Sequence, residues 1–464
     1  MTTISTLYYG GFEMLHDIGD FYYDSSRLIL CDKTITKDDY KIICDNIKPN
    51  DTYKEDLLYL SNAMQHQVSM KQRVVEKAGI ILTFNCNLRC TYCSQNSTEN
   101  SNNEVSINDV EAFAKEIIKK RVIASIVSKK ERNVTFYFTG GGESTYYWDK
   151  FEKVIHIIEK LCAENNVKLN LEMATNAVFN DKQRKFIAKH FDSVMVSYDG
   201  MPETQDRNRV TSNNLPTSIL VERSIKYFMN SNIDLTIRST VWQYDLPKLP
   251  QMLSYLHEHF PKINSWEIYP VTPAGRAVPI MDSRQECSQY DFIKAYLNLI
   301  EYAEKENCLF NITSPILTCS PIGFNCGGIG ADTMGAWLFP NRKISTCPDS
   351  SDVMTQIGEI KNSQVIWYDT FSDPLLEMGY EKYQTCNTCL AFRICGSGCP
   401  IKHIREKQFK TGMLSWECSM QCKLFEHILK TVMSGKNCFG WSKEKLETPL
   451  TSNIKVYKLI YSNS

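Results

Sequence analysis

The feature of this sequence that most constrains its fold is an alternation of short apolar runs and amphipathic stretches between residues 79 and 305. The apolar runs have the length of β-strands, and the stretches that follow have the apolar spacing of α-helices. The runs occupy residues 79–84, 134–139, 167–174, 193–198, 233–241 and 265–270, and the helical stretches occupy 107–120, 149–164, 181–189, 217–230, 247–258 and 290–305. Such repeats predict an α/β fold with a parallel sheet and right-handed crossovers. Periodicity alone does not choose between an open sheet, a doubly wound sheet and a partial barrel.

The chain divides into three regions around this alternation. Residues 1–75 carry strand-like segments followed by helical ones at 36–46 and 53–67, which predicts a small N-terminal α+β module. Residues 76–310 contain the β–α repeats. In residues 311–464 Cys, Gly and Pro replace the alternation, which predicts a domain stabilised by metal more than by a large apolar core.

Composition and charge exclude several classes of function. The formal net charge of -1 at pH 7 supplies no basic field for binding nucleic acid. The first residues show neither the basic start nor the apolar core of a signal peptide, and no apolar run approaches the length of a membrane span. We therefore expect a cytoplasmic protein with no nucleic-acid or membrane partner.

Cysteine is the residue type whose number departs most from the average. The chain has 18 cysteines, and the cytosol keeps thiols reduced. Cys86, Cys90 and Cys93 form a tight group, and nine more lie between residues 319 and 422. Metal or cluster binding accounts for this close spacing without requiring export.

The first cysteine group directly follows the first predicted strand. Three thiolates on one short loop can bind three irons of a four-iron cubane, which leaves the fourth iron open. An open coordination position lets a metal centre bind a substrate instead of being only structural. A structural zinc site is the alternative, but no further Cys or His follows within about twenty residues.

The spacing Cys86-x3-Cys90-x2-Cys93, with the aromatic Tyr92 before the last cysteine, resembles the signature of radical S-adenosylmethionine (SAM) enzymes. The resemblance covers about residues 79–275. It implies a partial (β/α)6 TIM-like barrel, a [4Fe–4S] cluster that binds SAM, and an external electron donor such as flavodoxin or ferredoxin.

The resemblance also implies which residues contact SAM, because the matching motifs follow successive strands. They are Tyr92, Gly141, Gly142, Glu143, Asn176, Ser197, Asp199, Arg209 and Val241. Glu143 would bind the SAM amino group, the serine and aspartate would meet the ribose and neighbouring groups, and Arg209 would pair with the SAM carboxylate. An ordinary surface ion pair is the alternative for Arg209. The chain departs from the family at Ser144, where the family has Pro, and at Ala177, where it has Gly.

The C-terminal cysteines resemble a SPASM domain, which accompanies radical SAM enzymes that modify peptides. The resemblance implies two auxiliary [4Fe–4S] clusters, which bring the total to three. The first auxiliary cluster would be bound by Cys319, Cys326, Cys347 and Cys399. The last cluster is bound by Cys386, Cys389, Cys395 and Cys418, with Cys422 as the alternative final ligand. The family has a Gly where this chain has Arg342. Two zinc ribbons are the alternative to the auxiliary clusters, because Cys-x2-Cys is also a zinc spacing.

The favoured hypothesis from this resemblance is a maturase of a RiPP, a ribosomally made and post-translationally modified peptide. Such an enzyme installs a carbon–carbon, ether (darobactin-type) or thioether cross-link in a precursor peptide. Residues 1–75 would then resemble a RiPP recognition element, which binds a leader peptide as an added strand, for instance beside residues 28–31. Alternatively, this module only braces the barrel.

Two other functions remain open. An anaerobic sulfatase-maturing enzyme oxidises Ser or Cys to formylglycine with the same three clusters, but such enzymes generally lack an N-terminal extension of this size. In that family an Asp directly after the hairpin cysteine is a candidate base, whereas this chain has Pro348 there and Asp349 one step later. A non-catalytic peptide carrier that keeps its clusters only for structure is the third hypothesis.

Overall fold

The computed structural model describes residues 6–9, 13–47, 72–97, 104–128, 131–271, 275–277, 288–308, 310–314, 316–317, 333–349, 355–368, 386, 389–395, 413–446 and 455–462. Contacts divide the chain into two units. The larger unit comprises Ala63–Pro315 and Gly327–Leu375, and the smaller comprises Met1–Asn62, Ile316–Cys326 and Leu376–Ser464. Each unit has its own sheet.

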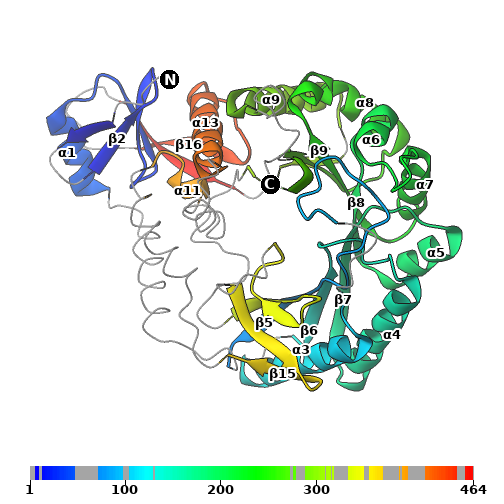
Figure 1. Ribbon diagram of the computed structural model, residues 1–464. Helices are drawn as coiled ribbons and strands as arrows, with labels where there is room; N and C mark the ends of the chain where they lie inside the picture. The colour runs from blue at the N-terminus through cyan, green and yellow to red at the C-terminus, as the bar shows by residue number, and fades with distance from the viewer. Residues whose placement is uncertain are drawn as a thin grey trace. The chain divides into compact units, whose positions relative to one another are not determined.

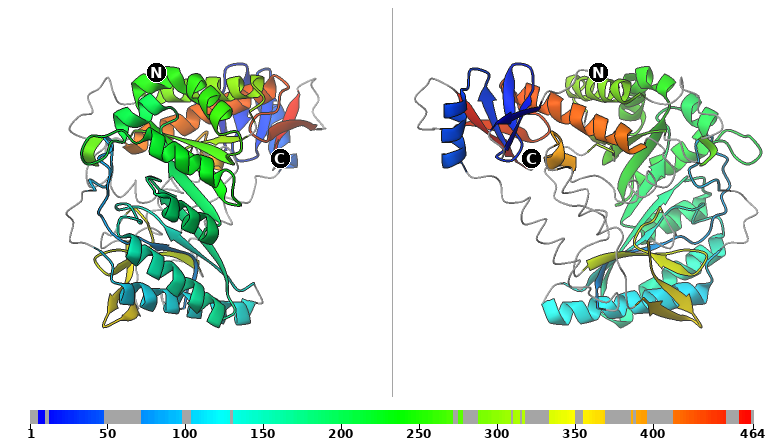
Figure 2. Two further views of the ribbon diagram at one scale, coloured as in Figure 1. Left: turned by 90° about the vertical axis from the view of Figure 1, so that its right-hand side faces the viewer. Right: turned by 60° about the vertical axis from the view of Figure 1, so that its left-hand side comes forward.

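The larger unit is built on parallel strands that lie side by side in sequence order (Figure 1). They are β5 (Val74–Ile80), β6 (Asn133–Phe138), β7 (Lys168–Thr175), β8 (Ser193–Ser197), β9 (Asp234–Val241) and β10 (Ser265–Pro270). The connecting helices are α3 (Ile107–Ser128), α4 (Trp148–Glu164), α5 (Asp181–His190), α6 (Pro202–Asn208), α7 (Ser218–Phe228) and α8 (Leu249–His259), and α9 (Gln289–Lys305) follows the last strand. Figures 1 and 2 show α4 to α8, teal to green, along one face of the curved sheet. The predicted α/β fold with a partial (β/α)6 barrel is confirmed.

The helices form where the sequence supplies a cap and an apolar stripe. α5 begins with a capping box, in which the Asn180 side chain accepts from the Gln183 N–H at 3.0 Å and the Gln183 side chain accepts from the Asn180 N–H at 2.8 Å. α4 buries one face against the sheet through residues at helical spacing, which are Phe151, Val154, Ile155, Ile158, Leu161 and Cys162.

The central strand that differs most from the prediction is the first. The apolar run at 79–84 favours a strand there, but β5 pairs earlier, over Val74–Ile80. Ile81 and Leu82 are buried, and the Ile81 N–H donates to the Leu338 oxygen at 2.9 Å. The apolar character of Ile81 and Leu82 reflects their burial, and it does not indicate that they belong to the strand.

Further strands extend this sheet at both edges. β11 (Asn311–Thr313) pairs parallel with β10, and β12 (Thr333–Leu338) pairs parallel with β5. β13 (Lys343–Ser345), β14 (Gln356–Lys361) and β15 (Gln364–Trp367) follow in antiparallel pairing. Arg342 lies in the turn between β12 and β13 with a φ of 65°, the left-handed region that favours Gly. Its Nε lies 2.9 Å from Asp109 Oδ2, so the turn forms with Arg in place of the family's Gly.

The smaller unit contains an antiparallel sheet with the order β1-β2-β3-β4-β17-β16. Its strands are β1 (Thr6–Tyr9), β2 (Glu13–Asp17), β3 (Phe21–Asp24), β4 (Ile29–Asp32), β16 (Trp441–Leu446) and β17 (Val456–Tyr461). Its described helices are α1 (Lys37–Asn46), α11 (Phe392–Cys395) and α13 (Met413–Met433). β4 and β17 pair with Leu30 opposite Tyr457, so strands from residues 1–75 and from 311–464 share one sheet.

This pairing corrects the expectation of a free sheet edge at residues 28–31. β4 is paired with β3 on one side and with β17 on the other. The hydrogen-bonding groups that a leader peptide would need are already used by the protein. The predicted helix at 53–67 lies outside the described residues. Among the helices that the structure describes, none combines the length and the apolarity needed to cross a bilayer.

Candidate functional site

The three-cysteine loop, residues 84–97, follows β5 at the C-terminal ends of the parallel strands. Parallel sheets bind their ligands at this edge. The Arg89 N–H donates to the Val210 oxygen at 2.8 Å, and the Thr91 N–H donates to the Asn208 oxygen at 2.9 Å. The backbone beside the cysteines is therefore fixed by residues far along the chain.

Arg276 binds the other end of the three-cysteine loop. Its Nε donates to the Cys90 oxygen at 2.9 Å and its Nη1 donates to the Ser97 oxygen at 2.8 Å. Gly275 has a φ of 55°, and a Cβ there would lie 2.2 Å from the Cys93 oxygen. The sequence prediction missed Arg276. Its place shortly after β10, at the same edge of the sheet, was the available signal.

The glycine loop after β6 packs its backbone against the three-cysteine loop. The Gly142 N–H donates to the Thr83 oxygen at 2.9 Å. A Cβ on Gly142 would lie 1.9 Å from the Asn85 oxygen, and Gly141 has a φ of 67°. Gly142 is required because its backbone approaches Asn85 closely, and Gly141 is required because its conformation is left-handed.

Glu143 joins the ends of β6 and β7 and is 4% exposed. Its Oε1 accepts from the hydroxyls of Thr145 at 2.8 Å and Thr175 at 3.0 Å. Its Oε2 accepts from the Asn176 N–H at 2.8 Å. Burial raises the pKa of Glu143, and these donors oppose the rise. The carboxylate is thus fixed in orientation, and its local environment would favour an ammonium group as a further partner.

Asn176 lies against the first cysteine of the loop. Its Nδ2 donates to Asn87 Oδ1 at 2.8 Å and lies 3.8 Å from Cys86 Sγ. Burial raises the pKa of Cys86 to about 12, and the charge of Glu143 adds to the rise. A thiol in this environment is protonated at neutral pH unless a bound metal ion stabilises the thiolate.

Ala177 adopts the conformation of the Gly that it replaces. It is fully buried and has a φ of 55°. Its N–H donates to Thr175 Oγ1 at 3.0 Å, and its oxygen accepts from the Ser224 hydroxyl at 2.7 Å. These contacts maintain a backbone conformation that costs an L-residue about 1–2 kcal/mol.

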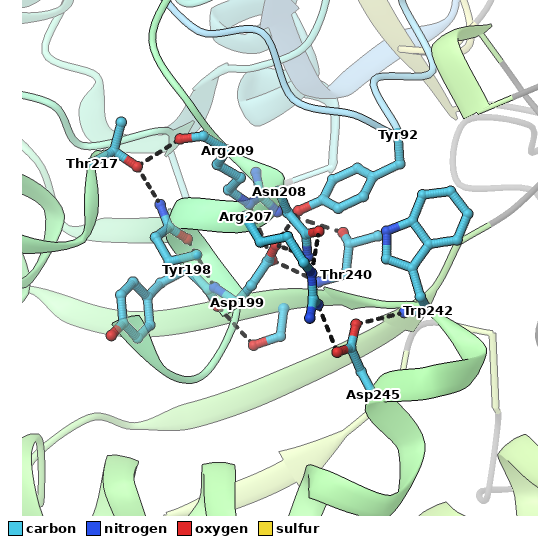
Figure 3. Close-up of polar contacts among 12 residues, drawn as sticks. Tyr92, Tyr198, Asp199, Arg207, Asn208, Arg209, Thr217, Thr240, Trp242 and Asp245 are labelled. Carbon is cyan, nitrogen blue, oxygen red and sulfur yellow. Dashed lines mark hydrogen bonds and ion pairs between the residues drawn. The ribbon is translucent and has the colours of Figure 1, made fainter. Parts of the chain in front are cut away.

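Asp199 is the centre of the polar network in Figure 3. Its carboxylate is fully buried. Its Oδ1 accepts from Arg209 Nε at 3.0 Å and from the Thr240 N–H at 3.1 Å. Its Oδ2 accepts from Asn208 Nδ2 at 3.1 Å and from the Tyr92 hydroxyl. A carboxylate offers about four lone-pair sites. Donors of the protein itself therefore bind both oxygens of this carboxylate, and its predicted contact with the ribose of SAM and neighbouring groups stays a prediction.

Arg209 is likewise engaged within the protein. Besides its Nε contact with Asp199, its guanidinium carbon lies 5.2 Å from the centre of the Tyr92 ring. Burial lowers the pKa of Arg209, but the charges of Asp199, Tyr92 and Cys90 and the hydrogen bond to Asp199 together raise it by more, so the guanidinium stays charged. The ion pair that the sequence suggested as an alternative does form, although it is buried instead of exposed.

Two further predicted contacts lie at strand ends. Ser197 is the last residue of β8 and is half-buried. Val241 is the last residue of β9 and is fully buried, and its oxygen accepts from the Val271 N–H at 2.9 Å.

Trp242 forms an apolar wall beside the three-cysteine loop, and Figure 3 shows its indole next to Tyr92. Cys90 packs against the same group. Trp242 Nε1 and Thr91 Oγ1 are buried without a hydrogen-bond partner among the described residues. Buried polar atoms are rarely left unpaired. Together with thiols that need a metal to ionise, these atoms fit a bound iron–sulfur cluster with a polar ligand.

Cysteines of the smaller unit gather at α11 and α13. Cys389 Sγ and Cys422 Sγ lie 3.6 Å apart. The hydrogen bond from Cys422 lowers the pKa of Cys389 to about 7 and raises that of Cys422. Burial raises the pKa of Cys395 to about 12, and the charges of Cys418, Cys389 and Cys386 add to the rise. Cys418 is exposed and lies one turn from Cys422, so both remain candidates for the last ligand.

The other predicted ligands are described only in part. Cys347 follows β13 in the larger unit, and its N–H donates to the Ser345 hydroxyl at 3.1 Å. Asp349, the candidate base, is exposed. Three ligands of the same predicted cluster lie outside the described residues, namely Cys319, Cys326 and Cys399.

Comparison with known proteins relates this site to a family. Residues 80–243 match the sequence model of the Radical SAM superfamily. The chain is 21% identical over 367 residues to the cysteine-type anaerobic sulfatase-maturating enzyme of Clostridium perfringens (strain ATCC 13124), with 76% of this chain and 95% of that protein covered. It is 27% identical over 158 residues to the enzyme of the same name from Clostridium novyi (strain NT), with 34% and 41% covered. The structure of native anSMEcpe with bound AdoMet matches with a TM-score of 0.60 and 18% identity, over 77% of this chain and 98% of that chain.

These relatives correct the functional prediction. The hypothesis of a peptide cross-linking maturase is wrong, because the curated relatives that match most of the chain are sulfatase-maturating enzymes. The alternative from the sequence is the better supported one. Two sequence features disfavoured this alternative, namely Pro348 and the long N-terminal region. The similarity nevertheless covers 95% of the relative.

Proposed function

This chain is a radical SAM enzyme, and from that premise we propose that it oxidises a cysteine side chain of a protein substrate to formylglycine, as anaerobic sulfatase-maturing enzymes do. The observation that carries the proposal is the extent of the similarity. It spans 76% of this chain and 95% of a cysteine-type relative, which is far more than the radical SAM segment at residues 80–243.

The radical SAM family implies SAM and a [4Fe–4S] cluster, and the three-cysteine loop fits both. When bound, they supply a 5′-deoxyadenosyl radical that takes a hydrogen from an unactivated carbon. We assign the three thiolates of Cys86, Cys90 and Cys93 to three irons of that cluster. Glu143 would accept a hydrogen bond from the SAM amino group, because its carboxylate is buried and already oriented by neutral donors.

Asp199 has a positioning role in this proposal. Its contacts with Tyr92 and Arg209 connect the three-cysteine loop to the ends of α6 and β9. A shift in this carboxylate would therefore move the tyrosine that lies between Cys90 and Cys93. The apolar wall formed by Trp242 and its neighbours would exclude water from the three-cysteine loop.

The proposed change is a two-electron oxidation of the substrate cysteine. One hydrogen atom leaves Cβ with the deoxyadenosyl radical, and the thiol proton and one electron leave next, which gives a thioaldehyde. Water then replaces the sulfur, which departs as hydrogen sulfide, and an aldehyde remains. The released electron needs an acceptor of the iron–sulfur class.

We propose that auxiliary [4Fe–4S] clusters in the C-terminal cysteines are this acceptor. Clusters with four protein ligands have no open iron, so they suit electron transfer and not substrate binding. The close approach of Cys389 and Cys422 and the influence of Cys418 on Cys395 support a metal centre among these thiols. Flavodoxin or ferredoxin would supply the electron that starts the reaction.

The test uses the enzyme purified without oxygen, given a reductant, SAM and a peptide that carries the cysteine segment of a sulfatase from the same organism. We expect mass spectrometry to show that the peptide has lost one sulfur and two hydrogens and gained one oxygen. A hydrazide probe should react with the product, and 5′-deoxyadenosine should form in parallel.

Two controls make this test specific. A peptide with Ala in place of the cysteine should form no aldehyde, and the Cys93→Ala enzyme should form no 5′-deoxyadenosine. Loss of only two hydrogens, with the sulfur retained in the peptide, would contradict the proposed aldehyde chemistry. It would leave the radical SAM assignment intact.

A further inference from the structure

Three metal-ligating side chains meet between α4 and α5, away from the strand ends. His156 and Glu159 lie one turn apart on α4, and His190 is the last residue of α5. Figure 1 shows these two helices as neighbours on the outer side of the larger unit. One ligand atom from each residue lies within 4.8 Å of the other two.

One separation within this group matches that of two ligands around one metal ion, and the other is shorter. Glu159 Oε2 lies 3.2 Å from His156 Nδ1, and Glu159 Oε1 lies 2.5 Å from His190 Nδ1. Zinc ligands lie about 2.0–2.2 Å from the metal, so two of them in a tetrahedron are about 3.3 Å apart. Small side-chain rotations would place all three ligand atoms around a common centre.

The surroundings orient the group and leave one side open. The His190 side chain is 9% exposed, whereas that of His156 is 55% exposed. The Phe186 ring stacks on His190 with ring centres 4.2 Å apart and contacts His156 edge-on at 5.5 Å. The imidazole of His190 is therefore fixed by packing, while solvent can reach the group from the side of His156.

We propose that His156, Glu159 and His190 form a binding site for a divalent transition metal, for which zinc is the best match. Two imidazoles and a carboxylate are ligands that zinc accepts, and water would be the fourth. The ion would replace the hydrogen bonds that now join the carboxylate to the two imidazoles. It would link α4 to α5, and the site is independent of the proposed substrate.

A simple hydrogen-bonded group is the alternative, and it makes a different prediction. A half-exposed His–Glu contact contributes little to stability and needs no metal. A metal site instead requires all three ligands, so removal of any one should release the ion. His257 on α8 is a suitable control, because it belongs to no such triad among the described residues.

The experiment adds one equivalent of Zn²⁺ to the holoenzyme with its clusters assembled and records the zinc K-edge X-ray absorption. We expect nitrogen and oxygen neighbours at about 2.0–2.1 Å, whereas zinc bound by stray thiols would show sulfur at about 2.3 Å. The nitrogen and oxygen signal should disappear in His156→Asn and Glu159→Gln and persist in His257→Asn. Zinc should also raise Tm in the wild type and not in the first two variants.

Three results would overturn the proposal. They are failure to bind the added zinc, a spectrum with sulfur neighbours only, and a nitrogen and oxygen spectrum that His156→Asn and Glu159→Gln leave unchanged. His156 is more than half exposed, so its substitution tests the site without endangering the fold. Iron content measured in every variant would show that the clusters are intact.

Discussion

The two cysteine-rich regions of this chain are fixed in different ways. In the three-cysteine loop, backbone groups bond to segments far away in the sequence. The Thr91 N–H donates to the Asn208 oxygen, and the Cys90 oxygen accepts from Arg276 Nε. These bonds use peptide groups and a guanidinium, so they do not require a metal.

At α11, the described backbone hydrogen bonds of the cysteines are local. The Cys389 N–H donates to the Cys386 oxygen at 2.8 Å, and the Cys395 N–H donates to the Ala391 oxygen at 2.9 Å. Turns of this length are weak by themselves. The comparison indicates that the barrel preforms the first site, whereas the second depends on what its thiols bind.

Removing the buried carboxylate should be the strongest test of the preformed site. We expect Asp199→Ala to lower the free energy of unfolding of the larger unit by about 3–5 kcal/mol, because Arg209 is left as an uncompensated buried charge. Denaturant unfolding of the variant and wild type measures this difference. The control Glu164→Gln removes one partner of an ion pair with Lys160 in which both side chains are exposed, and it should cause no measurable change. Loss of SAM binding with unchanged stability would show that Asp199 contacts the cofactor instead.

Iron removal should have the next largest effect, and it should change amide hydrogen exchange in only one of the two regions. After chelation, we expect amide hydrogen exchange in residues 389–395 to accelerate about 100-fold or more, because local turns lose the metal that fixes them. The amides of Arg89 and Thr91 should change little, since their acceptors belong to the barrel. Mass spectrometry of peptides from both regions measures the exchange. Equal acceleration in both regions would show that the first site is not preformed.

The thiols of the two regions should also differ in reactivity. The thiolate is the nucleophile, so alkylation of Cys389 in iron-free protein should rise with pH to half its maximum near pH 7. Cys86, with a pKa of about 12, should stay largely protonated at pH 8. After allowing for the greater nucleophilicity of a more basic thiolate, we expect a rate difference of about 50-fold. Quantitative mass spectrometry after brief iodoacetamide treatment measures both sites. Cys422→Ala should move the midpoint of Cys389 towards higher pH, and an unmoved midpoint would contradict the assigned cause.

The smallest expected effect concerns a strained residue of the first site. Ala177→Gly removes the strain of the left-handed conformation, which costs the folded protein about 1–2 kcal/mol. The Gly also stabilises the unfolded chain by about 0.4–1 kcal/mol, because it increases the conformational entropy of that chain. We therefore expect a net stabilisation of about 1 kcal/mol or less, measured by thermal unfolding. Ala188→Gly within α5 should instead destabilise by about 1 kcal/mol. Similar losses in both variants would mean that Ala177 is not strained.

The sequence by itself determined the order of the β–α repeats and the edge of the sheet at which the three-cysteine loop lies. These features depend on apolar periodicity within segments of strand or helix length and on the spacing of Cys86, Cys90 and Cys93. The same information placed β5 too late, because burial and strand pairing favour the same apolar residues. It also led to the wrong functional hypothesis, since cluster spacing does not specify a substrate.

Only the tertiary structure decided what the polar side chains do. The sequence predicted that Asp199 meets the ribose of SAM and neighbouring groups, and the structure adds four donors from three segments that bind its oxygens. Arg276 and the pairing of β4 with β17 were likewise invisible to local patterns. Periodicity records which residues are buried within one element, whereas hydrogen-bond partners depend on which distant elements the fold brings within about 3 Å.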